Sequence, residues 1–251
     1  AEKICNLEAK PLSINDGGTS NNKGSKRMPQ PPTIQAVAVP MDGYHFTRKE
    51  LANVAKALGD DDGTKGMSRR GASWTFDAKA LVDDLAKAKS SGKASLPEYD
   101  RALSDPVENA VTVEESHQII LVEGNYLILG LLRAEVETTT NSPLPGSRLQ
   151  NGCSDLLCPT PIGEEISRWR ETAALWDETW FVAPPGSNAV ETQRGRIIER
   201  SLETWNPSKT KAWGGSTDRE AAIKRAEFND VRNAKLVECC RNYADLIVDS
   251  I

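Results

Sequence analysis

The sequence predicts an α/β fold with a mostly parallel sheet. Four short apolar runs have the character of buried strands, and they lie at residues 34–39, 118–122, 180–182 and 246–248. Segments with the apolar spacing of amphipathic helices separate these runs, and such alternation is typical of parallel sheets covered by helices. The chain has 251 residues, of which 38% are hydrophobic and 27% charged. These values suit a single domain over residues 1–251 with a sizeable core.

The N-terminal region begins with a short helical pattern and a polar stretch. Residues 1–9 place Ile4 and Leu7 at helical spacing, which predicts the end of a helix. Residues 10–33 are rich in Gly, Ser, Asn, Lys and Pro, and this composition predicts a flexible insertion. The first strand follows this insertion, and Pro40 marks its end.

Two amphipathic helices are predicted between the first two strands. Thr47 and Glu50 form a capping box, in which each side chain can bond to the backbone N–H of the other residue. Apolar residues over 51–58 follow at the helical spacing i, i+3, i+4 and i+7. The second helix can be capped by Thr75 or Asp77. Its apolar face consists of Ala78, Leu81, Val82 and Leu85.

The second half of the chain repeats the alternation of strands and helices. The strand at 118–122 is the clearest of the four and ends at a Glu-Gly pair. Residues 134–163 contain Thr repeats with Pro, Gly and Ser, which predicts a second flexible insertion. Helices are expected at about 164–176, 188–205 and 218–242, from their apolar period and capping residues.

Composition and charge exclude several classes of protein. The net charge is −5, so the chain lacks the basic surplus that non-specific nucleic-acid binding needs. No apolar run approaches the ~20 residues of a membrane helix, and no signal peptide is evident. Five cysteines, an odd number in a chain of this size, favour a reducing compartment, and hence the cytoplasm, over a disulfide framework. The sequence leaves the oligomeric state open.

Carboxylates follow two of the predicted strands at matching positions. Asp42 comes after the first strand and Glu123 ends the second, and a glycine follows each of them. Ligands of parallel α/β sheets bind beyond the carboxyl ends of the strands. If the strands are neighbours, the two carboxylates can hold a divalent cation, and one of them can accept a proton from a hydroxyl. Taken singly, each is better explained as a strand-to-loop turn, whereas the two in matching positions favour a functional site.

Other polar residues border the same predicted crevice. His45 follows Asp42 by three residues and is either a substrate contact or a structural imidazole. Arg69 and Arg70 precede a glycine and can either bind an anion or remain solvated loop charges.

An arginine cluster lies on the helix expected at 188–205. Arg196 and Arg200 are four residues apart and share a face, with Arg194 close by. Guanidinium groups on one surface suit a phosphate chain because Arg donates in a planar fork. The alternative is a solvated helix face paired with Glu199 and Glu203.

Five motifs occur in a fixed order along the chain. They are Asp-Gly-Tyr-His at 42–45, Arg-Arg-Gly-Ala-Ser-Trp-Thr-Phe-Asp at 69–77, Leu-Pro-Glu-Tyr-Asp at 96–100, Val-Glu-Gly-Asn-Tyr at 122–126 and Asn-Asp-Val-Arg-Asn-Ala at 229–234. This set resembles the P-loop kinases that include uridine kinase, phosphoribulokinase and bacterial pantothenate kinase. Within that group it is most similar to the uridine kinase-like branch, with its fungal ATP-dependent kinases and bacterial fructose-transport-type kinases. The likeness spans about 34–132 and 175–250.

The resemblance implies a three-layer parallel sheet with helices on both faces, and a kinase that uses ATP and Mg²⁺ to phosphorylate a small-molecule hydroxyl acceptor. Asp42 matches the catalytic aspartate that accepts the hydroxyl proton, and Glu123 matches the acidic residue near the magnesium. Two further sets of positions match contacts with ligands. The substrate contacts are Tyr44, His45, Arg70 and Tyr126, and the contacts with the ATP phosphates are Arg196 and Arg200.

The sequence departs from this family at its hallmark. A Gly-rich loop ending in Gly-Lys-Ser/Thr normally cradles the phosphates, and the sequence contains no such loop. The opening residues 1–4 resemble the helix that follows the loop, so the first strand and the loop are expected to be missing through truncation. The other explanation is a chain that naturally lacks them, which would make it a metabolite- or partner-binding relative without kinase activity. A nucleoside triphosphate hydrolase is a third alternative.

Overall fold

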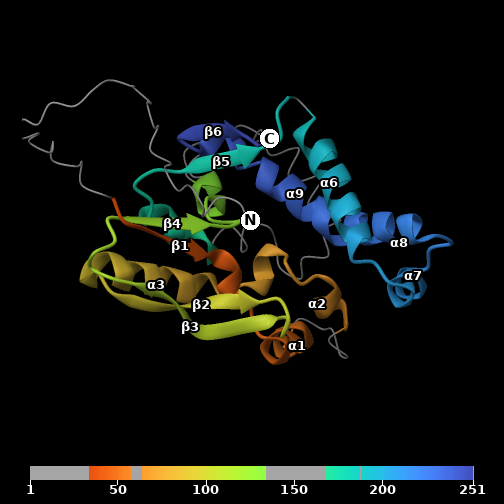
Figure 1. Ribbon diagram of the computed structural model, residues 1–251, viewed down its shortest axis with the longest axis horizontal. Coiled ribbons are helices and arrows are strands. Elements are labelled where there is room, and N and C mark those ends of the chain that lie inside the picture. Colours follow the sequence, from red (N-terminus) through yellow and green to blue (C-terminus); the bar gives the residue numbers. More distant parts are fainter. Residues whose placement is uncertain (1–33, 58–63, 134–167, 187, 251) are drawn as a thin grey trace, which may run out of the picture.

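The computed structural model describes residues 34–57, 64–133, 168–186 and 188–250 (Figure 1). The helix expected over residues 1–9 and the two expected insertions, at 10–33 and 134–163, lie outside these ranges.

All four predicted strands are present, and they form two parallel pairs. β1 (Ala36–Pro40) pairs with β4 (Ile119–Glu123), and the register places Pro40 opposite Glu123. β5 (Trp180–Ala183) pairs with β6 (Leu246–Asp249). The expectation of one continuous sheet is confirmed only in part, because the strands among the described residues form separate two-stranded sheets. Figure 1 shows the β5–β6 pair lying on the β4 side of the β1–β4 pair.

The sequence prediction missed a β-hairpin. β2 (Ala94–Asp100) and β3 (Asp105–Val113) pair in antiparallel fashion, so the strands are less uniformly parallel than expected. The pairing register shifts between Leu96 and Glu98, on either side of Pro97. Proline has no N–H to contribute to a ladder and is tolerated at such irregularities, so this residue made the segment look unlike a strand.

The helices of the first half begin where their caps predict. In α1 (Arg48–Ala57), the Glu50 carboxylate accepts from the Thr47 N–H at 2.9 Å, and the Glu50 N–H donates to the Thr47 hydroxyl at 3.2 Å. α3 (Ala78–Ser91) is capped by Asp77 and ends at a left-handed glycine. Shorter helical segments join these elements, namely α2 (Thr64–Ser68), η1 (Met41–Tyr44), η2 (Ser73–Thr75) and η3 (Leu129–Arg133).

The C-terminal helices are more broken than the periodicity predicts. α6 (Ala189–Glu203) matches its prediction closely. The helix expected at 218–242 is divided into α8 (Asp218–Arg225), the π-helix η5 (Ala226–Asp230) and α9 (Val231–Glu238). The helix expected at 164–176 is represented in the described residues by the short η4 (Arg170–Ala174). Two elements were not predicted, α7 (Pro207–Trp213) and η6 (Arg241–Tyr243).

Of the hydrophobic clusters in the described residues, the two larger ones stabilise different parts of the molecule. The larger one joins β1, α3, the hairpin and the segment after β4, and it contains the fully buried Trp169 and Tyr126. The smaller one lies among the C-terminal helices and consists of Ile197, Ile198, Ala222, Ala226 and Val231.

Several apolar side chains of the parallel strands remain open to solvent. The exposed fractions are 47% for Ile119 and 46% for Leu121 on β4, and 58% for Trp180 and 59% for Val182 on β5. Such strands are usually covered on both faces. Within the described ranges, no helix combines the length and apolar character needed to span a membrane.

Candidate active site

The two predicted carboxylates lie at the same end of a paired set of strands. Glu123 is the last residue of β4, and its register partner is Pro40 of β1. Asp42 lies in η1, two residues after Pro40. Loss of hydration raises the pKa of the Glu123 carboxyl, and the negative charge of Asp42 raises it further. The charge of Asp42 therefore acts on the Glu123 carboxyl, and a shared role in binding a cation stays a prediction.

Glycines allow the backbone segments beside these acids to approach closely. A Cβ atom on Gly43 would lie 2.3 Å from the carbonyl oxygen of Pro97 in β2, and one on Gly124 would lie 2.4 Å from the Cβ of Met41. Any larger residue would push η1 away from the hairpin or from the end of β4. The Asp-Gly and Glu-Gly pairs are thus explained by packing as well as by chemistry.

His45 is held against the backbone of Asp42. Its Nδ1 lies 2.8 Å from the Asp42 carbonyl oxygen and 3.9 Å from the carboxylate oxygen Oδ1. The ring packs on Phe76 and Tyr99, with centroids 3.9 Å and 5.0 Å away. Burial lowers the pKa of the imidazole, although Asp42 opposes this change. A largely neutral His45 therefore supports η1 beside the acids.

Arg70 is fixed by partners that the sequence did not reveal. Its guanidinium forms an ion pair with Asp105 at 2.7 Å, donates to the Phe46 carbonyl at 3.1 Å and lies over the ring of Tyr99. Asp105 also accepts from the Arg48 N–H at the start of α1. Because Asp105 is 35 residues away in the sequence, no local pattern could have identified it.

Two predicted substrate residues already use their hydroxyl groups within the protein. Tyr44 is buried and donates to Asp84 in α3 at 3.1 Å, and burial followed by the Asp84 charge raises its pKa. Tyr126 is fully buried and donates to the Gly71 carbonyl at 2.7 Å. These contacts give both tyrosines a role in shaping the site, and their contact with substrate stays a prediction.

The predicted phosphate arginines lie on α6. Arg196 and Arg200 are both exposed, and Arg196 donates to the Ser250 hydroxyl at 2.9 Å. Arg194 pairs instead with Glu191 and Glu227. The alternative pairing with Glu199 is not what the structure contains, because Glu199 pairs with Arg219 at 2.7 Å.

The acids form a pair rather than a larger cluster. Across the part of the chain that the structure describes, no group of three or more His, Cys, Asp or Glu side chains could hold a metal ion. A pair still fits Mg²⁺, which is commonly bound by one or two carboxylates together with substrate phosphates and water. Asp42 and Glu123 are the residues that could hold it.

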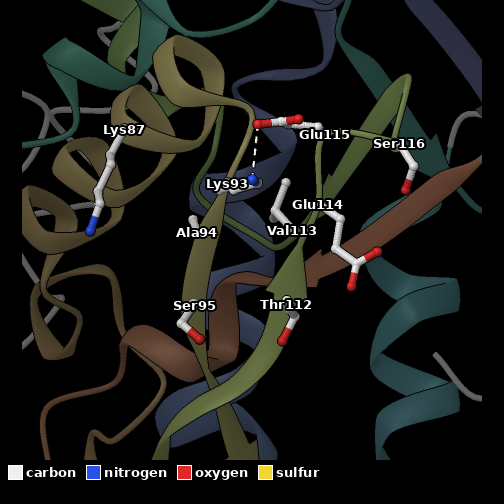
Figure 2. A pocket seen from close by; sticks show the side chains of 9 residues that line it. All are labelled: Lys87, Lys93, Ala94, Ser95, Thr112, Val113, Glu114, Glu115 and Ser116. Atoms are coloured by element: carbon white, nitrogen blue, oxygen red, sulfur yellow. Dashed lines mark ion pairs between the residues drawn. The ribbon is translucent and has the colours of Figure 1, made fainter.

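A separate hollow contains none of the predicted site residues. It has a volume of about 660 Å³ and is lined by residues from the end of α3, the start of β2 and the end of β3. Figure 2 shows the Lys93–Glu115 ion pair, 2.9 Å long, at its edge. Two lysines, Lys87 and Lys93, and two glutamates, Glu114 and Glu115, line this hollow. Their charges balance, so the hollow has no net preference for an anion.

The fold agrees with that of proteins described as kinases. A Schizosaccharomyces pombe protein provisionally named a uridine kinase is 37% identical over 215 residues, covering 85% of this chain and 68% of the relative. An Aspergillus versicolor protein named ATP-dependent kinase-like is 28% identical over 199 residues, covering 77% and 84%. A crystal structure of a provisionally named fructose transport system kinase from Silicibacter has a TM-score of 0.55 at 23% identity, covering 85% of this chain and 75% of that one.

The structural likeness indicates the class of fold, and the sequence likenesses indicate the family. The structural neighbour shows that the fold is the α/β fold of P-loop kinases. The sequence relatives show that the chain belongs to the uridine kinase-like family of these kinases. No protein-family model matches the chain.

Proposed function

We propose that this protein is an ATP-dependent kinase that transfers a phosphoryl group to a hydroxyl of a sugar, nucleoside or related metabolite. The observation that supports the proposal is the placement of Glu123 at the end of β4 and of Asp42 just after its register-matched partner β1, close enough for the Asp42 charge to raise the pKa of Glu123. Phosphoryl transfer depends on positioning and charge neutralisation more than on covalent chemistry. Two acids and a set of arginines supply these requirements.

Each residue has a defined part in this proposal. Asp42 is nearly half exposed, so its carboxylate can reach an acceptor hydroxyl and take its proton. Glu123, with Asp42, would hold Mg²⁺, which neutralises phosphate charge when bound. His45 and Arg70 border the acceptor side. Arg196 on α6, together with Arg200, would contact the ATP phosphates, because exposed guanidinium groups can turn toward an anion.

A second candidate function rests on a sequence observation. The 251 residues contain no Gly-x-x-x-x-Gly-Lys-Ser/Thr segment, and such a segment provides the backbone N–H groups and the Lys that hold the β- and γ-phosphates. A relative that binds a metabolite without phosphorylating it would meet this description. The acid pair beyond the paired strands favours the kinase, and ATP turnover decides between them.

The test is an assay of ADP release with Mg²⁺ and a panel of hydroxyl acceptors, on this chain and on any longer product of its gene. A kinase releases ADP only when its acceptor is present. Release without an acceptor would identify a hydrolase, and acceptor binding without release would identify a binding protein.

The role of Asp42 has a matched test. Asp42→Asn should lower kcat by about 10²–10⁴-fold, the usual contribution of a general base, while ATP binding is retained. The control is Asp83→Asn on α3, where an exposed carboxylate pairs only with Lys79, and its activity should equal that of the wild type. Near-full turnover by Asp42→Asn would remove Asp42 from the mechanism.

A further inference from the structure

Hydrogen bonds tie the segment 69–71 to η5 and α9, far along the chain. Arg69 is only 3% exposed, and its guanidinium crosses from this segment to η5 and α9. Its Nη1 donates to Asn229 Oδ1 at 2.6 Å and to the Phe228 carbonyl at 3.0 Å, while Nη2 donates to Asn233 Oδ1 at 3.3 Å. A buried charge held by several acceptors fixes a segment in both position and direction.

The same two asparagines return hydrogen bonds to the backbone of the segment. Asn229 Nδ2 donates to the Arg70 carbonyl at 3.0 Å, and Asn233 Nδ2 donates to the Gly71 carbonyl at 3.1 Å. Gly71 has a φ of +96°, so its peptide groups face a direction that most residues avoid. Each asparagine thus acts as an acceptor for Arg69 and as a donor to the chain beside it.

The four-residue spacing of Asn229 and Asn233 explains how both amides reach one segment, because residues i and i+4 share a helix face. Asn229 belongs to the π-helix η5, and Asn233 lies four residues later in α9. A π-helical turn is wider than an α-turn and re-aims the side chains that follow it, and such turns recur at functional sites. Asn229 is 5% exposed, which is uncommon for an asparagine and agrees with a fully bonded amide.

We propose that Asn229 and Asn233 are positioning residues that hold the 69–71 segment and thereby set the place where Arg70 presents its guanidinium in the candidate active site. Arg70 is anchored at both ends, because its carbonyl is held by Asn229 and its side chain by Asp105 and the Phe46 carbonyl. The part that Arg70 would take in catalysis rests on the proposed kinase function. The hydrogen bonds from Asn229 and Asn233 to residues 69–71, which we call the clamp, do not depend on that function. Asn229 lies in η5 and Asn233 in α9. They therefore link the part of the candidate site around Arg70 to the helices that follow α6.

The first test measures amide hydrogen exchange within the 69–76 segment. Asn233→Ala removes one amide from a half-buried position and so carries less risk of unfolding than a change at Asn229. We expect exchange of the Gly71 and Ala72 amides, which bond to Thr75 and Arg69, to rise about tenfold. Amides of β1 should change less than about twofold. A uniform change, or none, would contradict the clamp.

Two further variants separate the parts of the clamp. Asn233→Asp keeps an acceptor for Arg69 but loses the donor to the Gly71 carbonyl, so we expect it to raise exchange as Asn233→Ala does. Exchange at the wild-type rate would show that the bond to Gly71 contributes nothing. The control is Asn206→Ala, which removes the cap of α7 in the same half of the molecule and should leave the segment unchanged.

The second test measures the positioning of Arg70. A double-mutant cycle of Arg70→Ala and Asp105→Ala gives the coupling between these residues as a factor on the unfolding equilibrium constant. We expect a factor of about three to tenfold in the wild-type background, falling toward one in Asn233→Ala. An unchanged factor would overturn the positioning role. Neither measurement involves phosphoryl transfer, so failure of the kinase assay and failure of this proposal are separate results.

Discussion

The part of the molecule that holds Asp42 and Glu123 differs in construction from the part that holds Arg196 and Arg200, the arginines predicted to contact phosphate. Asp42 and Glu123 stand on a frame of strands and α3 around a core that contains fully buried Trp169 and Tyr126. The arginines stand on α6, whose core is small and aliphatic and whose surface is tied by exposed ion pairs. Exposed pairs contribute little to stability. The backbone that carries the acids therefore rests on a larger buried core than α6 does.

The largest expected effect tests the core of the acid-bearing half. Trp169→Ala should lower the free energy of unfolding by about 3–5 kcal/mol, because it empties a fully buried aromatic site that packs on Phe76 and Tyr126. Urea denaturation followed by circular dichroism measures it. The control Trp180→Ala alters a residue that is 58% exposed and should cost much less. Equal losses would remove the contrast between core and surface.

A second experiment makes one chemical change in both halves. Gly43→Ala should destabilise the protein by about 1–3 kcal/mol, because the new Cβ would lie 2.3 Å from the Pro97 carbonyl oxygen. Gly195→Ala on α6 meets nothing within 4 Å and should stabilise the helix by about 0.5–1 kcal/mol. Thermal unfolding of the two variants gives the opposite signs directly. The same sign for both would show that the close approach at η1 is not rigid.

The smallest expected effect concerns pH and His45. Burial lowers the pKa of this imidazole below its ordinary value of 6.5. The stabilisation from the neutral ring is therefore complete above pH 6.5 and is lost as the pH falls from there through the folded-state pKa. Between pH 8 and pH 5.5 the wild type should lose more thermal stability than His45→Gln, whose side chain does not titrate. Parallel curves for the two proteins would contradict the assignment.

Local signals explain what the sequence could predict. The Val- and Ile-rich runs predicted β1 and β4, and the acid-glycine pairs after them correctly marked where these two paired strands end. The capping residues placed the starts of α1 and α3. These features depend on neighbours within a few positions, so one sequence is sufficient to recognise them.

The features that were missed depend on distant partners or on breaks in a pattern. Asp105, the partner of Arg70, and Asn229, the partner of Arg69, lie far from them in the sequence. The β2–β3 hairpin was missed because Pro97 is atypical of a strand. The π-helix η5 keeps the apolar period of a long helix while changing its geometry, so the period alone could not reveal it. Only α7 had an overlooked local signal, the Asn206 cap followed by Pro207.

The open faces of β4 and β5 have a practical consequence. Ile119, Leu121, Trp180 and Val182 are each about half exposed, and apolar strands of this kind favour intermolecular pairing. We therefore expect these strands to promote self-association of the purified chain, whatever the strength of its core. Light scattering over a series of protein concentrations should detect the effect of these strands before any melting experiment does. Working stocks are best kept dilute.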